Sequence, residues 1–194
     1  ITVSNSDPVI SSLSISPNNS VYNDTVLTCT ATATDADETV TPTVEWTVGN
    51  STYTGTSLNL SNTSAMPTDI ITCTSTVTDS NGGTDADSTA VTVNNRAPSV
   101  TAVSITPNTS ILTNSTLTCS ATVNDDDGES LTPIYEWTVN SASLGASDTL
   151  TLTNGTIQPG DVLTCTATVN DNYGDSASDS TDVTVDNSNP TVDS

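Results

Sequence analysis

VLTCTATA, at residues 26–33, is the stretch that decides the fold, and the chain carries three close copies of it. The copies are IITCTSTV at residues 70–77, LTCSATV at residues 117–123 and LTCTATV at residues 163–169. Apolar and hydroxyl residues alternate through all four stretches. A period of two is typical of a β-strand that buries one face and exposes the other. The four stretches therefore predict four half-buried strands, each with a cysteine near its centre.

A tryptophan lies between the two cysteines of each pair. The resulting trio occurs twice, as Cys29, Trp46 and Cys73 and again as Cys119, Trp137 and Cys165. Cysteines on two strands, with a tryptophan on a strand between them, are typical of an immunoglobulin-like sandwich. We therefore expect an all-β chain of two tandem immunoglobulin-like β-sandwich domains, at residues 8–95 and 96–188.

The large apolar side chains are few, since the chain has no Phe and only two Trp. A disulfide that closes a loop of about 45 residues stabilises a domain by about 4 kcal/mol in the chain-entropy model. That is a large share of the roughly 5–10 kcal/mol that hold a small domain together. We expect one inter-sheet disulfide in each domain, Cys29–Cys73 and Cys119–Cys165, and hence an extracellular or cell-surface location.

The net charge is −22, and Arg96 is the single basic residue of the chain. Nucleic acid is excluded as a partner because almost nothing is present to neutralise phosphate. Anionic membrane surfaces are excluded for the same reason, and no apolar run is long enough to insert into a bilayer. Low apolar content with high charge also raises the alternative of disorder. The alternation and the paired cysteines argue against that alternative.

Both ends of the chain resemble the junction between its two halves. ITVSNSDP at residues 1–8 and VTVDNSNP at residues 183–190 match VTVNNRAP at residues 91–98. This predicts that residues 1–7 end a preceding repeat and that residues 189–194 begin a following one. The sequence is then expected to be a window of a longer tandem array.

The remaining strands are predicted from the same alternation. Leu27, Cys29, Ala31 and Ala33 are expected to point inward, and the threonines between them outward. The other expected strands are SLSISPN (12–18) with VSITPN (103–108), TVEWTV (43–48) with IYEWTV (134–139), SLNLS (57–61) with TLTLT (149–153), and STAVTV (88–93) with STDVTV (180–185).

The whole chain resembles the bacterial and archaeal immunoglobulin-like domains that occur in tandem in large surface proteins. The motifs that carry the resemblance are AP or NP before the first strand, LTC, an acidic turn, EWTV, and LTCT with VNDNYGD near the end. The acidic turns also look like those of cadherin-like and polycystic-kidney-disease-type repeats, although Glu38 stands where that turn usually has Gly. The resemblance implies a stalk, spacer, adhesin or filament subunit.

Catalysis is not expected, because the chain has neither His nor Lys to serve as a base for its hydroxyl nucleophiles. The cysteines are assigned to disulfides, which removes thiolate chemistry and zinc sites. A carboxylate pair of the glycosidase kind would need a cleft lined with aromatic side chains. The few aromatic residues are expected to be mostly buried, so we predict no enzyme activity and no organic cofactor.

Calcium is the one candidate cofactor, since clustered carboxylates and carbonyls suit this ion. The acidic loops after the first cysteine of each domain, which include Glu38 and Glu129, should lie at the same end as the turns after the second. The alternative is that these loops are solvated acidic faces, because no complete calcium-binding motif is present. The candidate ligands are Asp35, Asp37, Asp79, Asp125, Asp127 and Asp171.

N-glycosylation is predicted at sequons that fall in or beside turns, where a glycan can be accommodated. Chance gives about as many sequons in a chain this rich in Asn, Ser and Thr, but several recur at the repeat offset. The sequons are at Asn18, Asn23, Asn50, Asn59, Asn62, Asn108, Asn114 and Asn154.

Rows of threonine on the outward faces have three interpretations. They are Thr28 to Thr34, Thr72 to Thr78 and Thr164 to Thr168. Ice binding and O-linked glycans are two of them. The third is that threonine suits a wet sheet face through its β-propensity. The third is favoured over ice binding, and O-glycans stay open.

A structural role is the leading hypothesis: the chain serves as the stalk or shaft of an extracellular surface protein or filament. Its partners would be copies of itself or neighbouring repeats, joined head to tail by covalent continuation or by strand exchange. The alternative is an adhesin or carbohydrate-binding module that acts through loops at one end of the sandwich. Tyr53 and Tyr173 are the aromatic residues expected to be exposed for that purpose.

Overall fold

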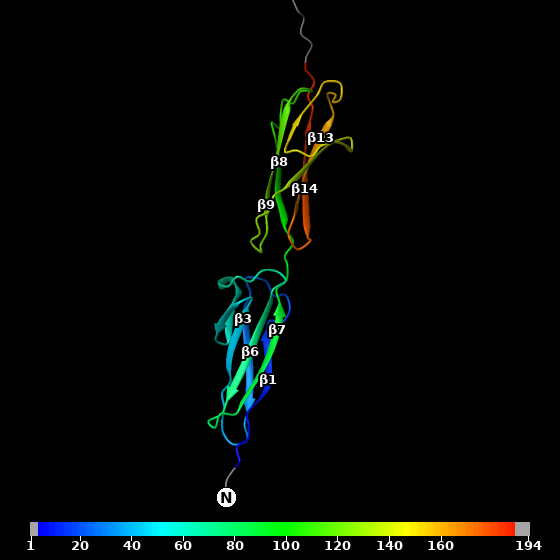
Figure 1. Ribbon diagram of the computed structural model, residues 1–194. Helices are drawn as coiled ribbons and strands as arrows, with labels where there is room; N and C mark the ends of the chain where they lie inside the picture. The colour runs from blue at the N-terminus through cyan, green and yellow to red at the C-terminus, as the bar shows by residue number, and fades with distance from the viewer. Residues whose placement is uncertain (1–3, 189–194) are drawn as a thin grey trace, which may run out of the picture. The chain divides into compact units, whose positions relative to one another are not determined.

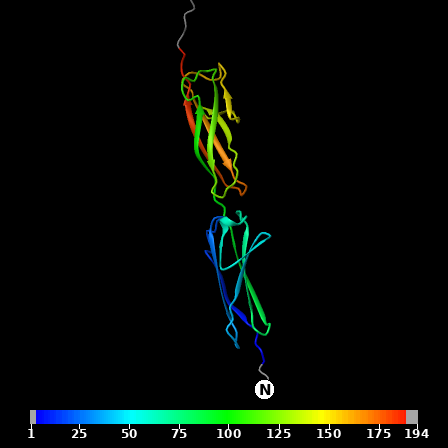
Figure 2. The same ribbon diagram turned by 90° about the vertical axis from the view of Figure 1, so that its left-hand side faces the viewer.

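The computed structural model describes residues 4–188 (Figure 1). Contacts between Cα atoms divide the chain into two compact units, Ile1–Asn95 and Arg96–Ser194, called unit 1 and unit 2 below. In each unit a three-stranded and a four-stranded antiparallel sheet form two packed layers, as the view turned by 90° also shows (Figure 2). Each unit is therefore a β-sandwich.

Unit 1 has the sheets β1-β2-β5 and β4-β3-β6-β7. A single turn of 3-10 helix, Leu60–Asn62, follows β5. The strands are β1 (Val9–Ser16), β2 (Val26–Thr34), β3 (Thr43–Val48), β4 (Ser51–Thr54), β5 (Ser57–Asn59), β6 (Ile70–Thr78) and β7 (Thr84–Thr92).

Unit 2 repeats this arrangement, with the sheets β12-β9-β8 and β11-β10-β13-β14. The strands are β8 (Ser99–Thr106), β9 (Thr116–Asn124), β10 (Ile134–Val139), β11 (Ala142–Gly145), β12 (Thr149–Thr151), β13 (Val162–Asn170) and β14 (Ser176–Thr184).

The alternation in β2 shows why these residues form strands. Leu27 and Cys29 are buried, whereas Val26 is 53% exposed and the threonines between the buried residues face solvent. Ala31 and Ala33 are half-buried on the inner face. The same exposure pattern recurs in β9, with Val123 in place of Ala33. In β13 the inner face is buried throughout and the threonines of the outer face are half-buried. The predicted all-β fold class is confirmed.

Each core lies between the two sheets and is closed by one disulfide. Cys29–Cys73 joins β2 to β6, and Cys119–Cys165 joins β9 to β13, each with a Cα–Cα distance of 6.5 Å. Trp46 and Trp137 are fully buried beside these bridges. Their indole N–H groups donate to the carbonyls of Gly55 and Ser147, at 2.9 and 3.0 Å. The inter-sheet disulfides and their tryptophans agree with the predicted sandwich.

Two features of the strands differ from expectation. The short edge strands β4 and β11 were not predicted, since STYT and ASLG show no clear alternation. On β6, outward threonines such as Thr72 and Thr74 are half-buried, because β6 is a central strand whose outer face is covered by neighbouring side chains.

The aromatic side chain of Tyr53 is also placed differently from the prediction. It lies half-buried on β4 and packs against the core of unit 1. The expectation that Tyr53 is an exposed aromatic residue is therefore wrong, and Tyr173, which was expected to be exposed as well, is also half-buried.

The terminal repeat fragments were predicted at residues 1–7 and 189–194. Residues 1–3 and 189–194 lie outside the described residues. Within residues 4–188, no helix has the length and apolar character needed to cross a bilayer.

Candidate functional site

The antiparallel topology brings two acidic segments of unit 2 to the same end of the sandwich. β13 runs antiparallel to β10, and β10 follows β9 through a single loop, so β9 and β13 end side by side. The β9–β10 loop starts at Asp125, and the β13–β14 turn starts at Asp171. The corresponding segments of unit 1 start at Asp35 and Asp79.

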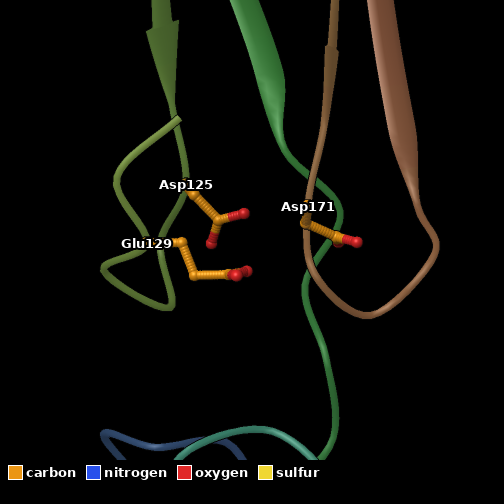
Figure 3. A group of neighbouring side chains, drawn as sticks. All are labelled: Asp125, Glu129 and Asp171. Atoms are coloured by element: carbon orange, nitrogen blue, oxygen red, sulfur yellow. The ribbon is translucent and has the colours of Figure 1, made fainter. Parts of the chain in front are cut away.

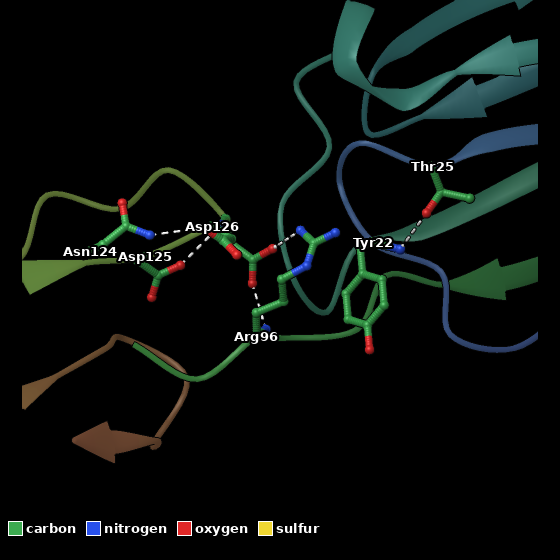
Figure 4. A network of polar contacts seen from close by, with 7 residues as sticks. Tyr22, Thr25, Arg96, Asn124, Asp125 and Asp126 are labelled. Carbon is green, nitrogen blue, oxygen red and sulfur yellow. Dashed lines mark hydrogen bonds and ion pairs between the residues drawn. The ribbon is translucent and has the colours of Figure 1, made fainter. Parts of the chain in front are cut away.

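Asp125 and Asp127 shape the β9–β10 loop. Asp125 Oδ1 accepts a hydrogen bond of 2.7 Å from the backbone N–H of Asp127. Asp127 is buried and faces Arg96, whose backbone N–H and Nη1 lie 2.6 and 2.9 Å from its two carboxylate oxygens. Asp126 faces solvent and accepts from the Asn124 amide at 2.8 Å (Figure 4). The single basic residue of the chain therefore neutralises Asp127.

The β13–β14 turn is organised by one oxygen of Asp171. Its Oδ1 accepts from the backbone N–H groups of Tyr173, Gly174 and Asp175, at 2.7–2.9 Å. The loop and the turn are linked through Glu129, whose Oε1 accepts from the side-chain amide of Asn172 at 2.6 Å. These bonds fix the carboxylates of both segments next to one another.

Asp125, Glu129 and Asp171 form one acidic cluster, called the unit 2 cluster below. One carboxylate oxygen from each residue lies within 4.8 Å of the other two. Asp125 and Glu129 extend from the β9–β10 loop beside the turn that carries Asp171 (Figure 3). Two buried oxygens, Asp125 Oδ2 and Glu129 Oε2, accept no hydrogen bond from any described residue. The cluster therefore offers oxygen ligands, and two of its residues have a buried oxygen that receives no hydrogen bond from the described protein.

The loops of unit 1 satisfy their carboxylates differently. Asp37 Oδ2 accepts from the backbone N–H of Ser6 at 2.6 Å, and Glu38 Oε1 accepts from Ser80 at 2.5 Å. Asp35 Oδ1 accepts from the backbone N–H of Asp37, while its buried Oδ2 has no donor among residues 4–188. All three carboxylates thus accept a hydrogen bond within the protein, and Asp35 Oδ2 alone is a buried oxygen of the three without a donor among residues 4–188.

Asp79 accepts hydrogen bonds at both of its carboxylate oxygens. Its Oδ2 accepts from the Asn5 amide at 2.9 Å, and its Oδ1 accepts from the backbone N–H groups of Asn81 and Gly83. The Asn5 amide, opposed by burial and helped by the backbone N–H groups, lowers the pKa of Asp79 below its ordinary value. Asp79 is therefore held ionised inside the turn.

Gly83 lies against this carboxylate. A Cβ at Gly83 would lie 2.6 Å from Asp79 Oδ2 and 2.5 Å from Asp7 Oδ1. In unit 2, Asp175 stands at the position of Gly83, and Ala97 at the position of Asp7. Each unit therefore carries a carboxylate at one of these two positions and a small residue at the other.

The six proposed metal ligands thus separate into groups. Asp125 and Asp171 belong to the unit 2 cluster, together with Glu129. Asp127 is bound by Arg96, Asp37 by Ser6, and Asp79 by Asn5. Asp35 accepts from the backbone of its own loop and belongs to no such cluster among the described residues. The roles of Asn5 and Arg96 were not predicted from the sequence. Their position just before the first strand of each unit, beside the acidic segments, is the signal that could have revealed them.

The sequons lie on the surface of both units. Seven of the eight asparagines are exposed, and Asn23 is half-buried. Asn59 Oδ1 accepts from the backbone N–H of Ser61, and Asn154 Oδ1 accepts from the Thr113 hydroxyl. Glycosylation at these positions stays a prediction.

Two shallow depressions occur in unit 1. One, of about 430 Å³, lies on the outer face of the sheet formed by β3, β4 and β6, and it is lined by threonines with Val44, Glu45 and Gly55. The other, of about 300 Å³, is lined by Ser4, Asn5, Asp37 and Asn81. No aromatic side chain lines either depression in the described part of the chain.

Neither a protein-family model nor a curated protein matches this chain. Similar solved structures include a bacterial ice-binding adhesin, at 19% identity and a TM-score of 0.39, over 94% of this chain and 66% of that one. Another comprises the fibronectin(III)-like modules of Clostridium thermocellum CbhA, at 16% identity and a TM-score of 0.33, over 90% and 94%. A third is Drosophila N-cadherin, at 13% identity and a TM-score of 0.31, over 92% and 50%.

Proposed function

We propose that this chain forms two repeats of the shaft of an extracellular surface protein or filament. The observation that carries the proposal is the duplication of a sandwich closed by its own disulfide. Disulfides persist in oxidising surroundings outside the cytoplasm, which supports the location. The described loops offer carboxylates and hydroxyls but neither His nor Lys, and that favours a structural role over catalysis.

The surface of the units suits a shaft in water. A net charge of −22 keeps neighbouring molecules apart and the protein soluble. The exposed threonines and serines supply a hydrated face of high β-propensity. Such a surface disfavours sideways aggregation of neighbouring molecules.

Immunogold electron microscopy of the source cells tests this proposal. An antibody raised against the chain should label fibres or a layer outside the cell. The matched control is the pre-immune serum from the same animal. Label confined to the cytoplasm would contradict the proposed location and, with it, the shaft role.

Head-to-tail continuation of further repeats is the proposed mode of assembly. Strand exchange through residues 1–6 or 189–194 is the alternative, in which a terminal strand completes a neighbour's sheet. Light scattering of the purified chain at rising concentration separates the two. Covalent continuation predicts a monomer throughout, whereas strand exchange predicts oligomers that disappear when the exchanged segment, residues 1–6 or 189–194, is deleted.

N-linked glycans are proposed on the exposed sequons, and O-linked glycans on the threonine rows. Exposed asparagines in or beside turns leave room for a sugar. The intact mass of material from the source tests this directly, before and after enzymatic removal of N-glycans. A mass equal to that of the bare polypeptide would contradict both kinds of modification.

Calcium is the proposed cofactor of the acidic loops, because carboxylate oxygens are the ligands that this hard cation prefers. The ion would offset part of the negative charge of the loops. Thermal unfolding in calcium should therefore occur at a higher midpoint than unfolding in chelator. An identical midpoint would contradict the proposal.

A second candidate function is carbohydrate binding, for which Tyr173 is the remaining candidate: it is half-buried and not fully exposed, but it lies in the β13–β14 turn and is not part of the core of unit 2. An aromatic ring on a loop can stack on a sugar face, although Tyr53 no longer supports this function. Glycan-array binding that is lost in Tyr173→Ala and kept in Tyr53→Phe would favour an adhesin. Absence of binding by the unmodified chain would reject it.

A further inference from the structure

Two buried carboxylate oxygens of unit 2 need a partner that the described protein does not provide. Asp125 is only 9% exposed, and its Oδ2 accepts no hydrogen bond from residues 4–188. The same holds for the buried Oε2 of Glu129. A buried ionised oxygen without a donor is costly, because it loses its hydration and gains nothing in exchange. These two oxygens therefore point to a ligand other than the described residues.

We propose that Asp125, Glu129 and Asp171 bind one Ca²⁺ ion and thereby join the β9–β10 loop to the β13–β14 turn. This rests on the proposed calcium binding of the shaft and adds the location and the number of ions. The three oxygens lie within 4.8 Å of one another. Oxygens bound to one Ca²⁺ at 2.3–2.6 Å are at most about 5.2 Å apart, so the cluster spans a distance that one ion can bridge.

The negative charge of the cluster favours a cation as its ligand. Three carboxylates crowd together in a chain whose single basic residue, Arg96, is bonded to Asp127. A divalent ion removes the repulsion between the carboxylates and supplies the missing partner for both buried oxygens. Ca²⁺ accepts six to eight oxygens in irregular geometry, so backbone carbonyls and waters can complete the shell. Mg²⁺ demands a smaller, nearly octahedral arrangement and fits the loose cluster less well.

Unit 1 is not expected to hold a matching ion. Both oxygens of Asp79 accept N–H donors, including the Asn5 amide, so this carboxylate is already satisfied. Asp35 Oδ2 has no donor, but no cluster comparable to that of unit 2 surrounds it among the described residues. The β9–β10 loop also contains an inserted glycine, Gly128, that the matching β2–β3 loop of unit 1 lacks. Gly128 has a φ of +87°, so the backbone leading to Glu129 follows a different path from that of unit 1. The predicted stoichiometry is one ion per chain.

Calorimetric titration of the chelator-treated whole chain with CaCl₂ tests the inference. Asp125→Asn keeps the oxygen that accepts from Asp127 and removes the charge, and Glu129→Gln does the same for the bond to Asn172. Both variants should weaken binding at least tenfold. The controls are Asp126→Asn, an exposed neighbour, and Asp35→Asn, the equivalent residue of unit 1. Each removes the same charge and should change the affinity less than twofold.

The outcomes are distinct. One Ca²⁺ per chain, weakened in both cluster variants and unchanged in both controls, supports the site. Binding that survives in correctly folded Asp125→Asn and Glu129→Gln, with the fold checked by near-ultraviolet circular dichroism, overturns the site but leaves calcium binding by the shaft standing. Absence of any saturable calcium binding overturns both. Equal affinity for MgCl₂ overturns the assignment to Ca²⁺.

Discussion

Arg96 donates to Asp127 twice, through its backbone N–H at 2.6 Å and through Nη1 at 2.9 Å. The carboxylate is only 3% exposed, so these donors replace most of the water that would otherwise hydrate it. Arg96→Met removes the guanidinium and should lower the stability of unit 2 by about 2 kcal/mol, the usual value of a hydrogen bond to a charged group. Urea unfolding followed by Trp fluorescence measures this. Arg96→Lys, which keeps a charge, should lose less, and equal stability of Arg96→Met and the parent would contradict the assignment.

Ser75 and Ala167 occupy equivalent positions in the two cores, and both are fully buried. The Ser75 hydroxyl has no hydrogen-bond partner among the described residues. Ser75→Ala should therefore stabilise unit 1 by about 1 kcal/mol, because it removes a buried polar group that forms no bond. Ala167→Ser should destabilise unit 2 by a similar amount. Chemical denaturation of both variants checks the pair, and a destabilising Ser75→Ala would show that the hydroxyl is bonded.

Gly83 has no room for a side chain. The exposed Asp7 carboxylate can swing away from a new Cβ, but Asp79 is held by three donors and cannot. Gly83→Ala should therefore destabilise unit 1 by about 1–3 kcal/mol, as overpacking usually does. Asp175→Ala, at the matching position of unit 2, is the control and should have a smaller effect. Equal midpoints for Gly83→Ala and the parent in thermal unfolding would rule out the crowding.

Asp79 makes the stability of unit 1 depend on pH. Its pKa is lower in the folded chain than in the unfolded chain, chiefly because of the Asn5 amide. The stabilisation is therefore complete above the unfolded pKa, near pH 4, and is lost as the pH falls through the folded pKa. Asn5→Ala should be less stable than the parent at pH 7, and the difference should shrink below about pH 4. Denaturation at several pH values measures this; Asn18→Ala, an exposed control, should show no such trend.

The sequence predicts a strand best where the alternation of the strand's own residues decides which face is buried. The alternation around Cys29 fixed the inward face, and TVEWTV was predicted with the bounds that β3 has in the structure. Strand β4 was missed because it is a short edge strand, defined by pairing with β3 and not by its own pattern. The periodicity of the sequence therefore predicts the main strands of the two layers but not every edge strand.

From the sequence, only the residue types of the candidate site could be predicted, and not its hydrogen bonds. Acidic residues in the loops indicated possible ligands, but their bonds depend on residues far away in the sequence. Asp127 accepts a hydrogen bond from Arg96, 31 positions earlier, and Asp79 accepts one from Asn5, 74 positions earlier. Which carboxylates remain for a cation therefore follows from the tertiary structure.

The disulfides offer the most direct test of how this chain stays folded. Each closes a loop of 44 or 46 residues, which corresponds to about 4 kcal/mol in the chain-entropy model. Replacing Cys29 and Cys73 by Ala should abolish the cooperative unfolding of unit 1 and leave that of unit 2, whereas the Cys119 and Cys165 double variant should do the reverse. Calorimetry of the two double variants and of the reduced, alkylated chain is the decisive measurement. We predict loss of one transition in each double variant and of both after reduction; two unchanged transitions after reduction would contradict the account.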